Sequence, residues 1–223
     1  MKIITKKSEK SLIEEFISNF KKEILKKKKR NKRFSFVLAG GKSPKELYKK
    51  LSTEEINWDK IDLFWSDERY VTHKSKHSNF KLVFEQLIKK INIKKKNIYP
   101  IYTDKKISVS VNEYSDKIKN YFKNKKIIFN FILLGMGEDG HVASIFSDNR
   151  NLNKKKIASY ICRNDFDRVT LNLNVINNSK KIILWLNNKY KTKRYEKIKR
   201  LRNQVPVNNL NKKNIFVYKI KKN

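Results

Sequence analysis

The chain has 223 residues, of which 39% are hydrophobic and 12% aromatic, which predicts a single folded domain over residues 1–223 and excludes a disordered chain. It carries 55 Lys and Arg against 21 Asp and Glu, a formal net charge of +34. No segment reaches the roughly 18 to 20 apolar residues that span a bilayer, and residues 1–10 lack the apolar centre of a signal peptide, so membrane insertion and secretion are not expected.

The first half of the chain predicts an opening helix, two strand–turn–helix units and one further helix. Apolar residues recur at helical spacing over 12–25. The apolar segment FSFVLA at 34–39 predicts the first strand, and IDLFW at 61–65 predicts the next strand, which runs into a polar loop. Helical patterns follow over 80–88 and 107–122.

The second half begins with the most strand-like segment of the chain, IIFNFILL at 127–134. Its unbroken hydrophobicity is typical of a central parallel strand that is covered on both faces. Apolar residues alternate over 169–173, which predicts another strand, and KIILWL at 181–186 predicts a third. A basic helix is expected from about residue 190, and a last strand over 215–220.

Strands that alternate with helices predict an α/β fold, a Rossmann-like three-layer sandwich with a mostly parallel central sheet. In such sheets, ligands bind beyond the carboxyl ends of the strands. Three segments rich in glycine or charge follow predicted strands, at 40–43, 66–69 and 135–141. We therefore expect a binding site where these three segments meet.

The segment GMGEDGH at 135–141 follows the strongest predicted strand and delivers His141 to its end. Three glycines in one loop cost chain entropy, which indicates that the loop needs them. An imidazole titrates near neutral pH and suits proton transfer from water. His141 is therefore the candidate general base, with capping of the next helix as the alternative; His73 and His77 lack such a setting and are expected at the surface.

Gly40 and Gly41 lie between a predicted strand and a predicted helix, with Ser43 at the helix start. Glycines at such a position let the backbone approach a ligand, and the free N–H groups that follow bind anions. A simple tight turn is the alternative interpretation.

Asp67, Glu68 and Arg69 place two acids and a guanidinium at another strand end. Arginine binds phosphate through two parallel hydrogen bonds. Arg168, at the start of a predicted strand, and Lys191, near a predicted helix start, are candidates for further cationic contacts.

Two kinds of site are disfavoured. Three scattered histidines and one cysteine give no zinc-ligand spacing, and no G-x-S-x-G segment indicates a serine nucleophile. With Cys162 as the only cysteine, no disulfide forms within the chain, and we interpret Cys162 as a small apolar residue near a strand. A reducing compartment fits, and we expect the cytoplasm.

The charge of +34 raises the possibility of nucleic-acid binding. However, only nine of the 55 basic residues are arginine, and the lysines are spread among many asparagines and isoleucines. Lys, Asn and Ile share A/T-rich codons, so biased base composition explains the charge more simply, and no specific nucleic-acid partner is expected.

Segments from both ends of the chain together resemble the 6-phosphogluconolactonase family, within the larger group that also contains glucosamine-6-phosphate deaminases. They are LAGGKSP at Leu38–Pro44, FWSDERYV at Phe64–Val71, Ser78-Asn79-Phe80, FILLGMGEDGHVASIF at Phe131–Phe146, RVTLN at Arg168–Asn172, and Lys191 of NKYK. The stretch from Gly135 to Phe146 is specific for the whole group, and the arginines distinguish its branches.

The resemblance implies a carboxylic ester hydrolase that opens 6-phospho-D-glucono-1,5-lactone to 6-phosphogluconate in the pentose phosphate pathway. It implies no metal or organic cofactor and a small-molecule sugar-phosphate partner, and we expect a monomer. It makes His141 the general base, with Asp139 and Glu138 shaping its loop. The implied substrate-binding residues are Gly40, Gly41, Ser43, Asp67, Glu68, Arg69, Asn79, Gly137, Arg168 and Lys191.

Two alternatives remain open at the level of sequence. The deaminase branch typically continues after the histidine with Phe-Asn-Glu-Pro and has tyrosine in place of Arg69, whereas this chain reads VASIFS after His141. The second alternative is a basic nucleic-acid-binding protein on a lactonase scaffold that has lost its activity. Retention of Asp67, Glu68, Arg69, Asp139 and His141 together argues against that loss.

Overall fold

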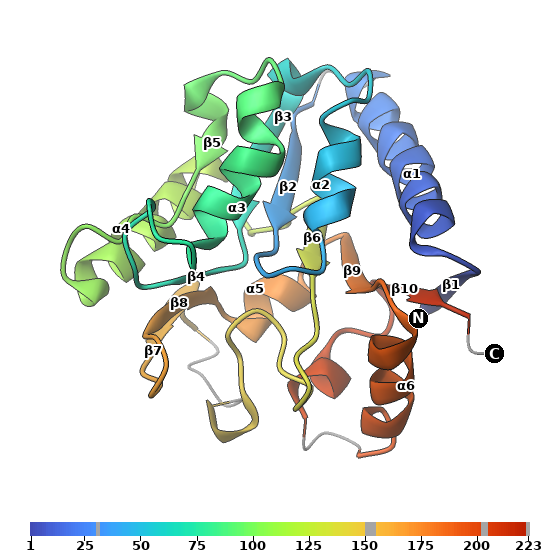
Figure 1. The fold of residues 1–223 in the computed structure, drawn as a ribbon. Helices are drawn as coiled ribbons and strands as arrows, with labels where there is room; N and C mark the ends of the chain where they lie inside the picture. The colour runs from blue at the N-terminus through green and yellow to red at the C-terminus, as the bar shows by residue number, and fades with distance from the viewer. Residues whose placement is uncertain (30–31, 150–154, 202–204, 222–223) are drawn as a thin grey trace.

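The structure is a computed structural model, and it describes residues 1–29, 32–149, 155–201 and 205–221. A seven-stranded parallel sheet forms the centre, and a three-stranded antiparallel sheet lies beside one end of it (Figure 1). This is the α/β sandwich with a parallel central sheet that the sequence predicts. Across the described ranges, no helix has the length and apolar character to cross a membrane.

The central sheet has the strand order β1-β10-β9-β6-β2-β3-β5, and every neighbouring pair is parallel. Its strands are β1 Lys2–Lys6, β2 Phe34–Leu38, β3 Ile61–Trp65, β5 Ile98–Tyr99, β6 Phe131–Leu134, β9 Lys181–Leu186 and β10 Ile215–Ile220. Because the strands are parallel, the loops that follow β2, β3 and β6 meet at one edge, below the sheet in Figure 1.

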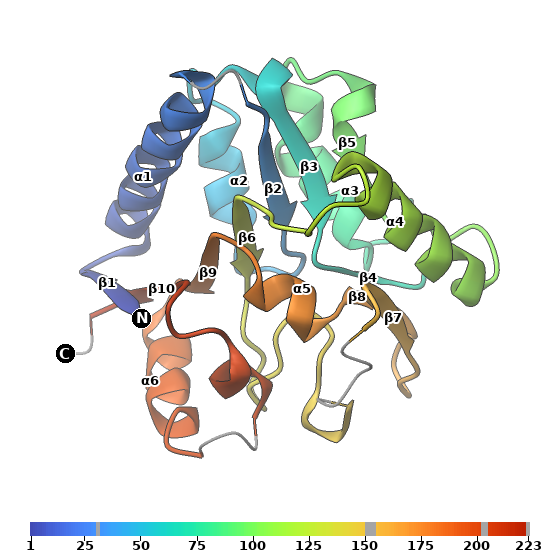
Figure 2. The same ribbon diagram turned by 180° about the vertical axis from the view of Figure 1, so that it is seen from behind.

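Helices cover both faces of this sheet. The helices α1, α2 and α3 cover one face, and α4 and α5 cover the other (Figures 1 and 2). The remaining α-helix of the described ranges, α6, packs against β9 and β10. Their bounds are α1 Glu9–Lys29, α2 Lys45–Leu51, α3 Asn79–Gln86, α4 Ile107–Tyr121, α5 Leu173–Asn177 and α6 Lys189–Ile198. Short 3₁₀ helices span Trp58–Lys60, Ile88–Lys90, Lys95–Asn97, Ser147–Asn149 and Pro206–Asn209.

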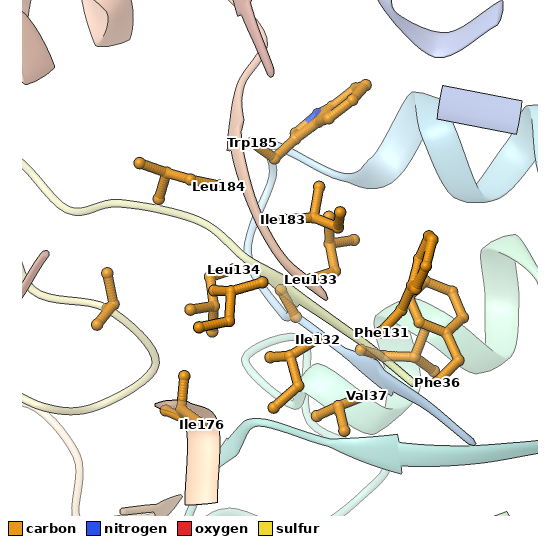
Figure 3. Close-up of a cluster of buried hydrophobic side chains, with 14 of the residues drawn as sticks. Phe36, Val37, Phe131, Ile132, Leu133, Leu134, Ile176, Ile183, Leu184 and Trp185 are labelled. Atoms are coloured by element: carbon orange, nitrogen blue, oxygen red, sulfur yellow. The ribbon is translucent and has the colours of Figure 1, made fainter. Parts of the chain in front are cut away.

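The core is built from the apolar faces that the periodicity predicts. Phe16 and Phe20 of α1 lie against Phe36 of β2 and Phe131 of β6, with ring centroids between 4.9 and 6.3 Å apart. Figure 3 shows the side chains of β2, β6 and β9 together, with Ile176 of α5 nearby. Burial of β6 on both faces explains its continuous apolar sequence.

The second sheet was not predicted from the sequence. It consists of β4 Asp67–Arg69, β8 Arg168–Leu171 and β7 Ala158–Ile161, all antiparallel. The expected polar loop at 67–69 is therefore a short strand, and the predicted strand at 169–173 ends earlier because Leu173 begins α5. Through β4 and β8, this sheet brings Arg69 and Arg168 into register.

Other boundaries also differ from prediction. The strand expected over 127–134 begins only at Phe131, because Asn130 instead exchanges hydrogen bonds of 3.0 Å with Ser35 through backbone and side-chain atoms. The helix expected through residue 88 ends at Gln86. The strands at 34–38, 61–65, 181–186 and 215–220 and the helices α1, α2, α4 and α6 confirm the predictions.

Candidate active site

A cleft with a volume of about 260 Å³ lies where the loops after β2, β3 and β6 meet. It is lined by Ala39, Gly40, Gly41, Lys42, Ser43, Ser66, Asp67, Arg69, Asn79, Gly135, Met136, Gly137, His141, Ala143, Ser144, Arg168 and Lys191. Of the site residues predicted from the sequence, all line this cleft except Glu68, Glu138 and Asp139. Residues as far apart in the chain as Ala39 and Lys191 therefore contribute to one site.

Two buried tyrosines fix the strand ends that support the cleft. The Tyr48 hydroxyl of α2 donates to the Ala39 carbonyl at 2.7 Å and accepts from the Ala39 amide at 3.0 Å. The Tyr114 hydroxyl of α4 makes the same pair of bonds with Trp65, also at 2.7 and 3.0 Å. Burial raises the pKa of both tyrosines far above the ordinary value, so both hydroxyls stay protonated. These bonds fix the backbone at Ala39 and Trp65, from which the loops of the cleft begin.

The glycine loop after β2 makes close contact with the start of α3. A Cβ atom added to Gly40 would lie 1.8 Å from Oδ1 of Asn79. Asn79 in turn donates from Nδ2 to the carbonyl of Asp67 at 2.9 Å. Gly41 has a φ of 75°, in the left-handed region that favours glycine. The loop therefore needs both glycines, one for space and one for conformation.

His141 is held by Asp139. Nδ1 of His141 lies 2.6 Å from Oδ1 of Asp139, which also accepts from the His141 backbone amide at 3.1 Å. The hydrogen bond from His141 lowers the pKa of Asp139 to about 2, against the opposing effect of burial. An ionised Asp139 accepts only, so Nδ1 carries the proton and Nε2 is left as the acceptor. The imidazole face lies against Phe146, with ring centroids 4.5 Å apart.

Besides Lys42 of the glycine loop, three cationic residues line the cleft, each from a different element. Lys191 of α6 donates from Nζ to Ser43 Oγ at 2.5 Å and to the Met136 carbonyl at 3.3 Å, and burial lowers its pKa. The Arg168 guanidinium of β8 makes two parallel bonds with Asp165, at 2.8 and 2.6 Å.

Arg69 of β4 donates from Nη1 to the His77 carbonyl at 2.9 Å. Together with Arg168 and Lys191 it gives the cleft the charge to bind an anion.

Two serines that sequence reasoning missed bind the Asp67 carboxylate in the cleft. Ser66 donates from Oγ at 3.0 Å, and Ser144 donates from Oγ at 2.7 Å. The turn that presents Ser144 includes Ala143 at a φ of 49°, and the Ser144 amide donates to Thr170 Oγ1 at 3.2 Å. Both serines lie inside the segments SDER and GHVAS, so their position next to the acid and the histidine was the available signal.

The two glutamates of the predicted set do not line the cleft. Glu68 is 1% exposed and binds the first residues of α3. Burial raises its pKa to about 7, which hydrogen bonds from Asn79 and Phe80 oppose. Glu138 is exposed, and its backbone carbonyl accepts from Arg194 of α6. The structure shows both residues contacting neighbouring elements and lining no part of the cleft.

The other predicted residues lie away from the cleft. His73 Nε2 lies 2.9 Å from the Ile101 carbonyl and the ring of His77 packs on Phe166, and both residues are half-buried at the surface outside the cleft, as predicted. Cys162 directly follows β7, near a strand as predicted, but it is exposed and so is not buried as a small apolar residue would be. Within the part of the chain that the structure describes, no three His, Cys, Asp or Glu side chains are grouped to hold a metal ion.

Replacing Gly137 with alanine is expected to displace the imidazole of His141. The added Cβ would lie 2.1 Å from Cε1 of His141, and rotation of the His141 side chain relieves that overlap without unfolding. If His141 is the catalytic base, kcat falls by about 10²-fold, the cost of misplacing a reacting group by about 1 Å.

Steady-state kinetics and the melting temperature test this prediction. Gly135→Ala is the matched variant, because its added Cβ meets no atom within 4 Å. An equal loss of kcat in the two variants would contradict the prediction.

Comparison with protein families places the chain beside sugar-phosphate enzymes. The family described as glucosamine-6-phosphate isomerases/6-phosphogluconolactonase matches residues 7–218. Among curated proteins, a 6-phosphogluconolactonase of Thermotoga maritima is 34% identical over 165 residues, 73% of each chain. A 6-phosphogluconolactonase of Nostoc sp. is 35% identical over 122 residues, and that alignment spans about half of either chain (53% and 51%).

Solved structures share the whole fold. The crystal structure of 6-phosphogluconolactonase from Thermotoga maritima superimposes with a TM-score of 0.87 at 27% identity and covers 99% of both chains. The enzyme from Trypanosoma cruzi gives a TM-score of 0.84 at 24% identity over 99% of this chain and 94% of that one. A monomeric glucosamine-6-phosphate deaminase also gives 0.84, at 15% identity over 99% and 98%. The last two resemblances concern the fold alone.

Proposed function

The chain belongs to the family of glucosamine-6-phosphate isomerases and 6-phosphogluconolactonases, and we propose that it hydrolyses 6-phospho-D-glucono-1,5-lactone to 6-phosphogluconate in the pentose phosphate pathway. The observation that carries the proposal is the His141–Asp139 pair, 2.6 Å apart, at a cleft that also holds Arg69, Arg168 and Lys191. In this proposal the base activates water against the ester carbonyl, and the three cations bind the phosphate and the sugar oxygens.

The reaction follows from the hydrogen bonding of His141. Asp139 occupies Nδ1, so Nε2 takes a proton from a water molecule as the water oxygen bonds to the lactone carbonyl carbon. When the tetrahedral intermediate collapses, the bond between that carbon and the ring oxygen breaks, and His141 returns its proton to the ring oxygen. The products are a carboxylic acid, which ionises, and a free hydroxyl, so atoms and protons balance.

The cations hold the phosphate and sugar oxygens in this proposal. Lys191 and Ser43 lie together at the glycine loop, while Arg168 and Arg69 face the cleft from paired strands. Because lactones open readily in water, binding the substrate beside one general base is enough to catalyse the reaction.

The surroundings of His141 favour lactone hydrolysis over deamination of glucosamine 6-phosphate. Over the described ranges, Asp139 is the one carboxylate bonded to the imidazole, and the ring face lies against the apolar Phe146. Arg69, where deaminases usually have tyrosine, lines the cleft. The sequence relatives named above are lactonases, whereas the deaminase resembles this chain in fold alone.

Parallel assays on two substrates test the choice of reaction. Freshly made 6-phosphogluconolactone is expected to be opened faster than it opens spontaneously, and glucosamine 6-phosphate is expected to release no ammonia. The proposal would be overturned in favour of deamination if glucosamine 6-phosphate released ammonia while the lactone opened only at its spontaneous rate.

Replacing Lys191 with methionine is expected to raise KM by about 10- to 100-fold, because one hydrogen-bonding charge to the phosphate is lost. The effect on kcat is expected to be smaller, since Lys191 contacts Ser43 and the Met136 carbonyl and makes no hydrogen bond to His141.

Initial rates over a range of lactone concentrations measure both constants. Lys193→Met, two residues along α6 and exposed, is the control for the loss of one charge. A KM that rises equally in both variants would indicate a general effect of charge instead of a contact at the cleft.

For the remaining features we propose a cytoplasmic monomer without a specific nucleic-acid partner. The general base and the cations that the proposal uses, His141, Arg69, Arg168 and Lys191, all come from this one chain. The exposed thiol of Cys162 suits a reducing compartment. Binding of DNA that weakens steeply with salt and shows no sequence preference is the expected behaviour of a chain with a charge of +34.

A further inference from the structure

Glu68 lies between two cleft residues and faces away from the cleft. In β4, side chains alternate between the two faces of the strand. Asp67 and Arg69 line the cleft, whereas Glu68 is 1% exposed. A buried carboxylate is costly unless it is hydrogen-bonded, so its partners indicate what it does.

Its partners are the first residues of α3. Oε1 of Glu68 accepts from the Asn79 amide at 2.7 Å, and Oε2 accepts from the Phe80 amide at 2.7 Å and from Ser78 Oγ at 3.1 Å. The Arg69 amide donates to Oε1 at 2.9 Å. The first amides of a helix have no partner within the helix, and a carboxylate there is also favoured by the helix dipole. Glu68 therefore joins β4 to the start of α3.

The joined segment carries two side chains of the cleft. Asn79, the first residue of α3, touches Gly40 and donates to the Asp67 carbonyl. Arg69 donates from its guanidinium to the carbonyl of His77, which lies two residues before α3. The positions of Asn79 and Arg69 thus both depend on where residues 77–80 lie, and Glu68 fixes that segment.

We propose that Glu68 is a positioning residue that holds Arg69 and Asn79 in the cleft for substrate binding and makes no contact with the substrate. The expected change in KM rests on the proposed lactone hydrolysis. The hydrogen bonds of Glu68 to the start of α3 do not depend on that proposal. The sequence had suggested a substrate contact for Glu68, and its burial behind β4 gives it this different task. The His141–Asp139 pair lies on another loop, so loss of Glu68 affects binding more than the chemical step.

Glu68→Gln tests the proposal, because the amide has the same size but places an N–H₂ group where one carboxylate oxygen accepts, toward either the Phe80 amide or the Asn79 and Arg69 amides. KM is expected to rise about 10-fold and kcat to change less than about 3-fold. In a chain that already carries Arg69→Ala, the same substitution is expected to raise KM by a smaller factor, because Glu68 acts partly through Arg69. Glu85→Gln, on the same helix but with 40% of its side chain exposed and paired with Lys89, is the matched control.

Hydrogen exchange at residues 77–80 provides a readout that needs no activity. The Asn79 and Phe80 amides are expected to exchange faster in Glu68→Gln than in the unmodified protein and in Glu85→Gln. If glutamine prevents folding, Glu68→Asp is used, with the same two changes expected at smaller size because the carboxylate is one methylene shorter.

The outcomes separate this inference from the proposed function. The inference would be overturned if a folded Glu68 variant showed unchanged hydrogen exchange and unchanged KM. A loss confined to kcat would also overturn it, as would a rise in KM that is equally large in the chain carrying Arg69→Ala. A protein without lactonase activity would refute the proposed function, and the exchange comparison would still decide whether Glu68 fixes the start of α3.

Discussion

Replacing His141 with asparagine is expected to lower kcat for lactone hydrolysis by about 10²- to 10⁴-fold, the usual contribution of a general base. Asparagine is close in size and polar, so the substitution leaves Gly137 and Phe146 in place while it removes the group that accepts a proton from water. KM is expected to change little, because in this account the phosphate is held by Arg69, Arg168 and Lys191.

The assay couples 6-phosphogluconate formation to its dehydrogenase, with spontaneous opening subtracted. His73→Asn is the control, because His73 lies away from the cleft on the face of Phe80, with ring centroids 4.4 Å apart. If His141→Asn keeps kcat within about 3-fold of the unmodified protein, His141 is not the base.

Replacing Asp139 with asparagine is expected to lower kcat by about 10²-fold, in the direction known for acid-to-amide changes beside a catalytic histidine. The carboxylate accepts both the Nδ1 proton and the backbone amide of His141. An asparagine oxygen can accept both bonds, but it carries no negative charge, so the imidazolium that forms when Nε2 takes a proton from water loses its stabilisation.

The pH dependence follows from the shifted pKa of Asp139. Its value of about 2 in the folded protein lies below the ordinary 3.8. The ionised form therefore stabilises the folded protein above about pH 4, and this contribution is lost as the pH falls toward 2. Asp139→Asn is accordingly expected to lower the melting temperature at pH 6 more than at pH 3, as measured by scanning calorimetry.

Kinetics across pH 5 to 9 show whether Asp139 orients His141 at every pH or acts by gaining and losing a proton. Because Asp139 is ionised throughout this range, kcat of the Asp139→Asn variant is expected to stay below that of the unmodified protein at every pH. Recovery of full activity at high pH would show that Asp139 does not set the tautomer of His141.

Much of the fold could be predicted because its strands are buried on both faces. The segments at 34–38, 61–65 and 181–186 are short apolar runs bounded by polar residues, the pattern that a covered parallel strand requires. By contrast, β1 at 2–6 carries lysines at both ends and lies at the edge of the sheet beside β10, so its pairing stabilises it more than its composition does.

The second sheet could not be predicted for a related reason. The strand β4 has only three residues, all charged, and it exists because it pairs with β8, about 100 residues later in the chain. Local propensity carries no information about such a pairing. The sequence therefore places the charges of 67–69 correctly at a strand end but does not reveal that Glu68 turns away from Asp67 and Arg69.

The site itself was predicted where glycines and charges follow strands. Residues 40–43 and 135–141 meet at one cleft because parallel strands end at the same edge of the sheet. Tyr48 and Tyr114 were not recognised, since tyrosines at helical spacing also suit an ordinary core, and their hydroxyl partners at Ala39 and Trp65 appear only in three dimensions. Lys191 could not be distinguished among so many lysines until α6 placed it beside Ser43.

The most direct test of the account is the initial rate of 6-phosphogluconolactone opening, measured side by side for the unmodified protein and His141→Asn after subtraction of the spontaneous rate. We expect a rate that is proportional to the concentration of the unmodified protein and falls by about 10²-fold or more in the variant. A folded, unmodified protein that never exceeds the spontaneous rate would contradict lactone hydrolysis, and equal rates in the two proteins would contradict the role of His141.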